Sequence, residues 1–131
     1  MIEKLISEAL IKSVKKLYDQ DLPDKLAQVQ KTRVEFEGDY TVVVFPLLRM
    51  SKKKPEQTAE EIGEDIKSDL DIIVDFNVVK GFLNLSLDNA FWLKYFSDNV
   101  NSDNYGINED KISDPFVIEY SSPNTNKPLH L

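Results

Sequence analysis

The chain has few of the residues that build special sites or scaffolds. Its 131 residues include no cysteine, a single histidine (His130), four glycines and six prolines. The lack of cysteine excludes a disulfide framework and thiol catalysis, and it fits a reducing compartment such as the cytoplasm. One histidine without cysteine argues against a transition-metal site, so we expect no bound metal. No apolar run approaches the roughly 20 residues that span a bilayer, and Glu3 and Glu8 interrupt the N-terminal apolar pattern. We therefore expect neither a membrane span nor a signal peptide.

Charge is unevenly distributed along the chain. The net charge of −7, taken alone, speaks against nucleic acid as a partner. However, residues 1–54 contain 11 Lys/Arg and 8 Asp/Glu, whereas residues 55–131 contain 5 and 15. This asymmetry allows a local basic surface on an acidic protein, and the simpler interpretation is a solvated surface of mixed charge.

The apolar pattern predicts one domain of helices and strands. Hydrophobic residues make up 41% of the chain, which is enough for a core. Three- and four-residue spacing predicts helices over residues 1–19, 55–70 and 88–100, and alternation predicts strands at 27–36, 72–79 and 82–87. In the last helix we expect five apolar side chains to be partly buried: Phe91, Trp92, Tyr95, Phe96 and Val100.

The segment 41–50 fits two structures. The sequence TVVVF at its start has strong strand preference. Yet Asp39 is a good N-cap, and Val43 and Leu47 have helical spacing. Pro46 forbids a central strand and is awkward inside a helix, so the residues alone leave both open.

The strand 82–87 has two distinct faces. Leu83, Leu85 and Leu87 share one parity and form the natural core face. Phe82, a large aromatic, then lies on the other face with two polar residues, Asn84 and Ser86. Lys80-Gly81 before it is a possible turn or bulge.

The C-terminal part reads as a polar connector, 102–113, a buried strand, 116–120, and a polar loop. Ligands of parallel sheets bind beyond the carboxyl ends of strands. The loop offers Ser122, Asn124, Lys127 and His130, which can hold an amino acid's charged groups or phosphate oxygens. A flexible polar tail is the alternative.

The loop SSPNTNKPLHL resembles the signature loop of arginyl-tRNA synthetases, Ser/Ala-Pro-Asn-x-x-Lys-x-x-His-x-Gly-His, from Ser122 through His130. Two further motifs of that family's N-terminal additional domain are matched by Gly38-Asp39-Tyr40 and Gly81-Phe82-Leu83-Asn84. The resemblance implies an α+β domain over residues 1–112, an antiparallel sheet packed with helices. Residues 113–131 would begin a Rossmann catalytic domain, cut inside the signature. It also favours a helix at 41–50, which we adopt.

The resemblance implies a role for each loop residue. The full-length enzyme would activate arginine with ATP and Mg²⁺ and attach it to tRNA(Arg). Ser122 and Asn124 would contact the arginine backbone groups, and Lys127 its carboxylate or the phosphates. His130 would be catalytic, stabilising charge on the ATP phosphates. We expect the fragment alone to be inactive, monomeric and cytoplasmic.

The resemblance assigns the N-terminal domain to the D-loop of the tRNA elbow. Phe82 would stack on an unpaired base and Asn84 would bond its edge; the alternative is that Phe82 packs under a helix. The run Arg49, Lys52, Lys53 and Lys54 would bind phosphates, or it is merely a charged helix end. Two rival interpretations are a free-standing α+β interaction module with a non-functional tail, and another nucleotidyl-transferring Rossmann enzyme. The Ser-Pro-Asn-x-x-Lys spacing argues against the second.

Overall fold

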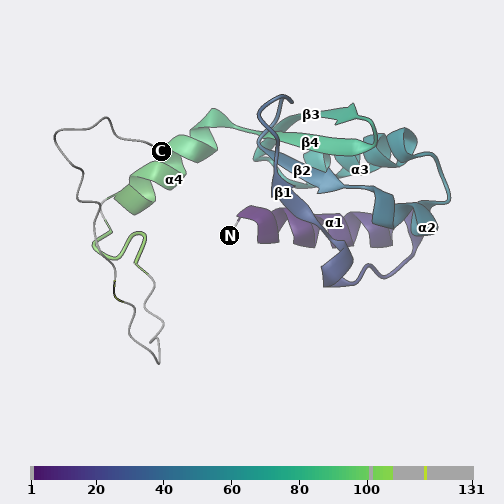
Figure 1. The fold of residues 1–131 in the computed structure, drawn as a ribbon, viewed down its shortest axis with the longest axis horizontal. Helices are drawn as coiled ribbons and strands as arrows, with labels where there is room; N and C mark the ends of the chain where they lie inside the picture. Colours follow the sequence, from purple (N-terminus) through teal and green to yellow (C-terminus); the bar gives the residue numbers. More distant parts are fainter. Residues whose placement is uncertain (1, 101, 108–116, 118–131) are drawn as a thin grey trace.

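The computed structural model describes residues 2–100, 102–107 and 117, and this part forms an α+β fold (Figure 1). The elements are α1 (Ile2–Tyr18), the 3₁₀ turn η1 (Asp24–Leu26), β1 (Val29–Lys31), β2 (Tyr40–Val43), the 3₁₀ turn η2 (Phe45–Leu47), α2 (Leu48–Ser51), α3 (Pro55–Asp69), β3 (Ile73–Val79), β4 (Phe82–Leu87) and α4 (Asn89–Val100). The strands form one sheet in the order β1-β2-β4-β3, with every neighbouring pair antiparallel. The expected fold class is thus confirmed. The expected boundary at residues 112/113 and, apart from Val117, the expected strand 116–120 lie outside the described residues.

The core lies between one face of the sheet and the helices α1 and α3 (Figure 1). The three leucines of β4 are buried there, as their alternation predicts. The core side chains on the sheet include Tyr40, Val42, Ile73, Leu83, Leu85 and Leu87, and those on α1 and α3 include Ile6, Leu10, Val14, Ala59, Ile62 and Ile66. No helix in the described part is both long and apolar enough to cross a membrane.

Gly63 lets α3 approach the sheet closely. A Cβ at this position would lie 2.7 Å from the Phe76 ring and 2.9 Å from Leu83 Cδ1. Glycine is a weak helix former, so the sequence shows this position only as a defect in the helix. The packing shows that it sets the distance between α3 and the two longest strands.

A bulge in β3 changes which residues face the core. The register between β3 and β4 is irregular between Ile73 and Asp75, and Val74 is 47% exposed. Ile73 therefore shares the helix-facing side with Phe76 and Val78, although its parity is different. The strict alternation read from the sequence fails at this one extra residue.

The segment 41–50 combines both structures that its sequence suggests. Tyr40–Val43 is the strand β2, so the helix expected from residue 41 is wrong there, whereas Leu48–Ser51 is helical. Pro46 lies between them in η2, where a 3₁₀ turn can accept it at its start. The strand expected at 27–36 is also shorter, because only Val29–Lys31 pairs with β2 and residues 32–39 form a loop.

The last helix exists as expected, but its burial is different. Asp88 caps it through a hydrogen bond from the Ala90 N–H to Asp88 Oδ1 (3.0 Å). Phe91, Trp92 and Tyr95 are partly buried. The expected burial of Phe96 and Val100 is wrong, since these side chains are 64% and 49% exposed.

A polar contact joins α1 to α3 beside the core. Asp65 on α3 accepts a hydrogen bond from Ser13 Oγ (2.6 Å) and forms an ion pair with Lys16, both on α1. Burial raises the pKa of the Asp65 carboxyl. The hydrogen bonds from Lys16 and Ser13 together lower it by more, so the pKa lies below its ordinary value. The charged carboxylate thus stabilises the contact between the two helices.

We expect the substitution Asp65→Asn to lower the free energy of unfolding by about 1.5–3 kcal/mol at neutral pH, the range for hydrogen bonds to charged groups. A carboxyl with a lowered folded-state pKa stabilises the fold above its unfolded pKa, about 4, and this contribution is lost as the pH falls through the folded value. Urea unfolding measures the difference in the free energy of unfolding between the parent and Asp65→Asn. This difference should be smaller near pH 3 than at neutral pH.

The matched control is Asp98→Asn, which removes the exposed pair that Asp98 forms with Lys94 on α4. Exposed pairs contribute about 0–1 kcal/mol, so this variant should unfold almost as the parent does. An Asp65→Asn difference of the same size at both pH values would contradict the electrostatic role of Asp65.

Candidate nucleic-acid interface

The sheet face opposite the helices carries Phe82 and Asn84. Both residues alternate with the core leucines, so they point away from α1 and α3, as the sequence predicts. The strand register places Thr41 and Asn77 on either side of Asn84, and Val79 beside Phe82. Polar side chains from three strands therefore meet on this face.

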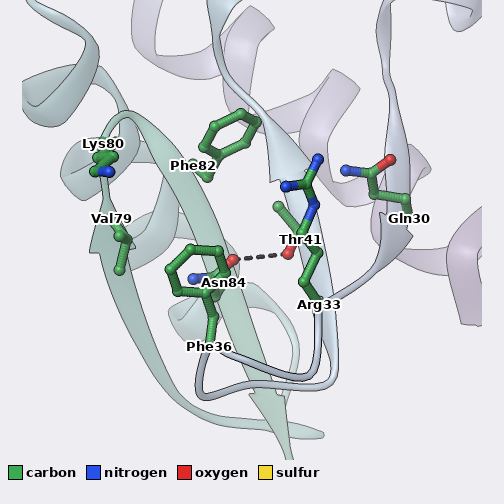
Figure 2. A pocket seen from close by; sticks show the side chains of 8 residues that line it. All are labelled: Gln30, Arg33, Phe36, Thr41, Val79, Lys80, Phe82 and Asn84. Carbon is green, nitrogen blue, oxygen red and sulfur yellow. Dashed lines mark hydrogen bonds between the residues drawn. The ribbon is translucent and has the colours of Figure 1, made fainter.

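These residues line a pocket of about 200 Å³. Its walls come from the strands, the β3–β4 turn and the loop 32–39. The lining residues are Gln30, Arg33, Phe36, Thr41, Val79, Lys80, Phe82 and Asn84 (Figure 2). In Figure 2, Lys80 and Val79 stand on one flank, and Arg33 and Gln30 on the other. The pocket combines aromatic rings with cationic and amide groups, which suits a base with its phosphate.

A directional hydrogen-bond chain fixes the amide of Asn84. The Glu37 main-chain carbonyl can only accept, so Asn77 Nδ2 donates to it (2.9 Å) and Asn77 Oδ1 faces Asn84. Asn84 Nδ2 donates to that oxygen (3.0 Å), and Asn84 Oδ1 accepts from the Thr41 hydroxyl (2.7 Å; Figure 2). The Thr41 hydroxyl also lies 3.0 Å from that of Thr32. Asn84 is 1% exposed, so its amide forms the floor of the pocket in a single orientation.

The Gly38-Asp39-Tyr40 motif holds the loop 32–39 against β4. Gly38 has a φ of 122°, and a Cβ there would lie 3.1 Å from Asn84 Cβ and 3.2 Å from the Leu85 carbonyl oxygen. Asp39 Oδ2 accepts a hydrogen bond from the Leu87 N–H (2.8 Å), and Tyr40 is buried in the core. Asp39 is therefore a strand partner, and the expectation that it caps a helix is wrong.

Phe82 is a partly buried ring supported from one side. Its ring meets Phe45 edge to face, with centroids 5.6 Å apart. The turn before it has positive φ at Lys80 (50°) and Gly81 (77°), which is the backbone of a two-residue hairpin. Phe82 thus lies on the open face and in the pocket lining, with Phe45 of η2 as its neighbour on that face.

The predicted basic run does not line the pocket. Arg49 lies on α2, Lys52 follows it with a φ of 54°, and Lys54 precedes α3. Lys53 turns toward α3 and donates to Glu61 Oε1 (2.6 Å), and this hydrogen bond lowers the pKa of Glu61. Lys53 also lies 5.8 Å from the centroid of the Tyr18 ring.

The pocket cations are instead Arg33 and Lys80, which the sequence reasoning missed. Both are exposed, and neither forms an ion pair with another described residue. Phe36, on the same loop as Arg33, was missed as well. The one available signal was the Gly38-Asp39 turn, which folds this loop back, but only the strand register shows where the loop lands.

The other predicted site residues cannot be compared with this pocket. Ser122, Asn124, Lys127 and His130 lie outside the part of the chain that the structure describes. Of the predicted site, the structure therefore brings together Phe82 and Asn84.

Known proteins resemble this chain over its whole length. It is 50% identical to the arginine–tRNA ligase of Bacteroides thetaiotaomicron over 131 residues, and 44% identical to that of Porphyromonas gingivalis over 132 residues. These alignments cover 99% and 100% of this chain but 22% of each relative, so the chain spans about a fifth of their length. The arginyl-tRNA synthetase of Thermus thermophilus has the same fold, with a TM-score of 0.59 and 23% identity over 72% of this chain and 15% of that one.

The family "Arginyl tRNA synthetase N terminal domain" matches residues 1–87, from α1 to the end of β4. This match covers the whole sheet and the pocket on its open face. Because it spans well over half of the sequence, the chain belongs to the arginyl-tRNA synthetase N-terminal domain family.

Proposed function

We propose that this domain binds an unpaired base of the D-loop of tRNA(Arg) in the pocket on its open sheet face. Phe82 would be the stacking platform, since every base has a face that an aromatic ring can stack on. Asn84 Nδ2 carries two protons, and the bond to Asn77 uses one. Because Asn84 is 1% exposed, the other would meet an acceptor only on a base that enters the pocket as far as its floor.

One observation carries this proposal: Phe82 and Asn84 line the same pocket, and Arg33 and Lys80 stand at its sides. A stacked base places its phosphate near the rim, where cations neutralise it. The remaining cations at Arg49, Lys52, Lys53 and Lys54 would extend this surface. A Cβ at Gly81 would lie 2.8 Å from Pro55, the residue after Lys54, so this run borders the hairpin turn. Local basic groups can thus attract RNA although the net charge is −7.

We further propose that the longer protein is an arginine–tRNA ligase, which is the name its relatives carry, and that it works in the cytoplasm. It would use ATP with Mg²⁺ to activate L-arginine before transfer to tRNA(Arg). Ser122, Asn124 and Lys127 would hold arginine and the phosphates, and His130 would stabilise the charge that develops on ATP. We expect the 131-residue chain alone to be inactive and monomeric.

In the full-length enzyme, Phe82→Ala is expected to raise the KM for tRNA(Arg) about 5- to 150-fold, because a lost stack costs about 1–3 kcal/mol. The KM values for arginine and ATP should stay near those of the parent. Aminoacylation kinetics with each substrate varied in turn will measure this. The control is Ser86→Ala, on the same strand and face but outside the pocket. Unchanged kinetics for Phe82→Ala would reject the D-loop role.

Arg33→Ala and Lys80→Ala are each expected to weaken tRNA binding by the full-length enzyme. Each should also reduce the slope of log affinity against log salt concentration by about 1, because one phosphate contact is lost. Fluorescence titration at several salt concentrations measures the slope. Lys25→Ala, an exposed cation on η1 outside the pocket, serves as the control. A slope that changes equally in all three variants would assign the effect to net charge and not to the pocket.

Lys127→Ala is expected to slow arginine activation by the full-length enzyme about 100-fold, the cost of removing one group that stabilises developing charge. ATP–pyrophosphate exchange measured with tRNA(Arg) present tests this. Normal exchange would remove Lys127 from the proposed site.

A further inference from the structure

The helix α4 is apolar on two sides, and only one of them contacts the domain. Its residues Phe91 and Trp92 pack against the core, and Phe91 and Tyr95 line a groove with Ile2 and Leu5 of α1. No α4 side chain is fully buried. The contact between the inner side of α4 and the rest of the domain is therefore partial.

The other side presents a continuous apolar stripe to solvent. Leu93 is 71% exposed, Phe96 64% and Val100 49%, and their spacing of three and four residues places them on one face. The polar sector of the helix is narrow and contains the Lys94–Asp98 ion pair. A helix with apolar residues on most of its circumference is typical of a buried helix, so this stripe needs a cover.

The similarity to longer proteins suggests which protein segment packs on this stripe. The family match ends at Leu87, two residues before α4 begins at Asn89, so this helix lies outside the matched residues. The identity to the longer relatives nevertheless extends over 99% of the chain, and this match covers only 22% of the relative's length. Figure 1 shows α4 leading away from the sheet. The helix lies between the domain and the remainder of the longer protein.

We propose that the stripe Leu93, Phe96 and Val100 is the docking surface for the part of the enzyme that follows residue 131. Tyr105 and Ile107, which follow the helix in sequence, are also apolar and exposed, at 60% and 61%. Contacts between domains of one chain typically bury about 600–1,500 Å², to which one helix face with two further side chains can contribute a large share. This packing would hold the domain at a fixed position relative to the remainder, whatever the domain itself binds.

Hydrogen exchange of the α4 amides tests this proposal without tRNA. Exchange is compared between the 131-residue chain and the full-length enzyme. We expect the amides of Asn89–Val100 to exchange at least about 10-fold more slowly in the full-length enzyme, because burial adds to the free energy of local opening. Equal exchange in both proteins would overturn the proposal.

Variants identify the face. Leu93→Glu and Phe96→Glu should each remove most of that protection in the full-length enzyme. Lys94→Gln changes the net charge by the same −1 on the polar side of the helix and should leave protection intact. The thermal unfolding midpoint of the 131-residue chain should be unchanged in all three, since these side chains are exposed there. Protection that survives Leu93→Glu and Phe96→Glu would overturn the proposal.

A second copy of the chain is the competing occupant. Sedimentation velocity of the 131-residue chain over a range of concentrations distinguishes it. A monomer supports docking on the enzyme's own remainder, whereas a dimer abolished by Phe96→Glu would assign the stripe to self-association instead.

Discussion

The candidate site depends on a buried amide on the sheet face that no helix covers. Asn84 is there because β4 alternates, and it is covered because Gly38 lets the loop 32–39 approach it closely. An uncompensated buried amide would destabilise the fold, so the loop must supply partners as well as cover. It does so through one main-chain carbonyl, at Glu37, which sets the direction of each bond from Asn77 to Asn84. The Gly38-Asp39 turn and the Gly81-Phe82 strand, 43 residues apart in sequence, are therefore two halves of one structure.

This dependence explains why the site was only half predictable. Period-two alternation is a local property, so it placed Phe82 and Asn84 correctly on the face away from the leucines. Arg33 and Phe36 reach the pocket through a loop whose path is decided by long-range contacts: Gly38 against β4, and Asp39 with the Leu87 N–H. Nothing near Arg33 in the sequence encodes that destination. A basic run such as 52–54 is conspicuous by composition, yet Lys53 is directed to Glu61 by its position before α3.

Prediction of the fold succeeded where a single hydrophobic pattern governs a segment, and it failed where two patterns compete. The helices α1 and α3 and the strand β4 follow one period over their length. In the segment 41–50, strand preference and helical spacing are both real, and the chain uses each in turn, with Pro46 at the junction. At Val74 one extra residue reverses the parity of β3, which no count of apolar residues can anticipate. For α4 the pattern correctly predicted a helix, but the expectation of burial assumed that its apolar face belongs to this domain's own core.

The apolar surfaces of β4 and α4 differ in what covers them. The leucines of β4 are buried by elements within the family's domain, and they stabilise it by themselves. The stripe on α4 lies beyond the residues that the family matches, and a continuous exposed apolar surface of this kind marks a contact site. The open sheet face is different again, because its aromatic rings are interleaved with amide and cationic groups in the pocket lining. A surface that stays covered can be uniformly apolar, whereas one that binds and releases a nucleotide also needs polar and charged groups. The two surfaces thus differ in chemistry in the way that the two proposed partners require, more protein for α4 and an RNA base for the pocket.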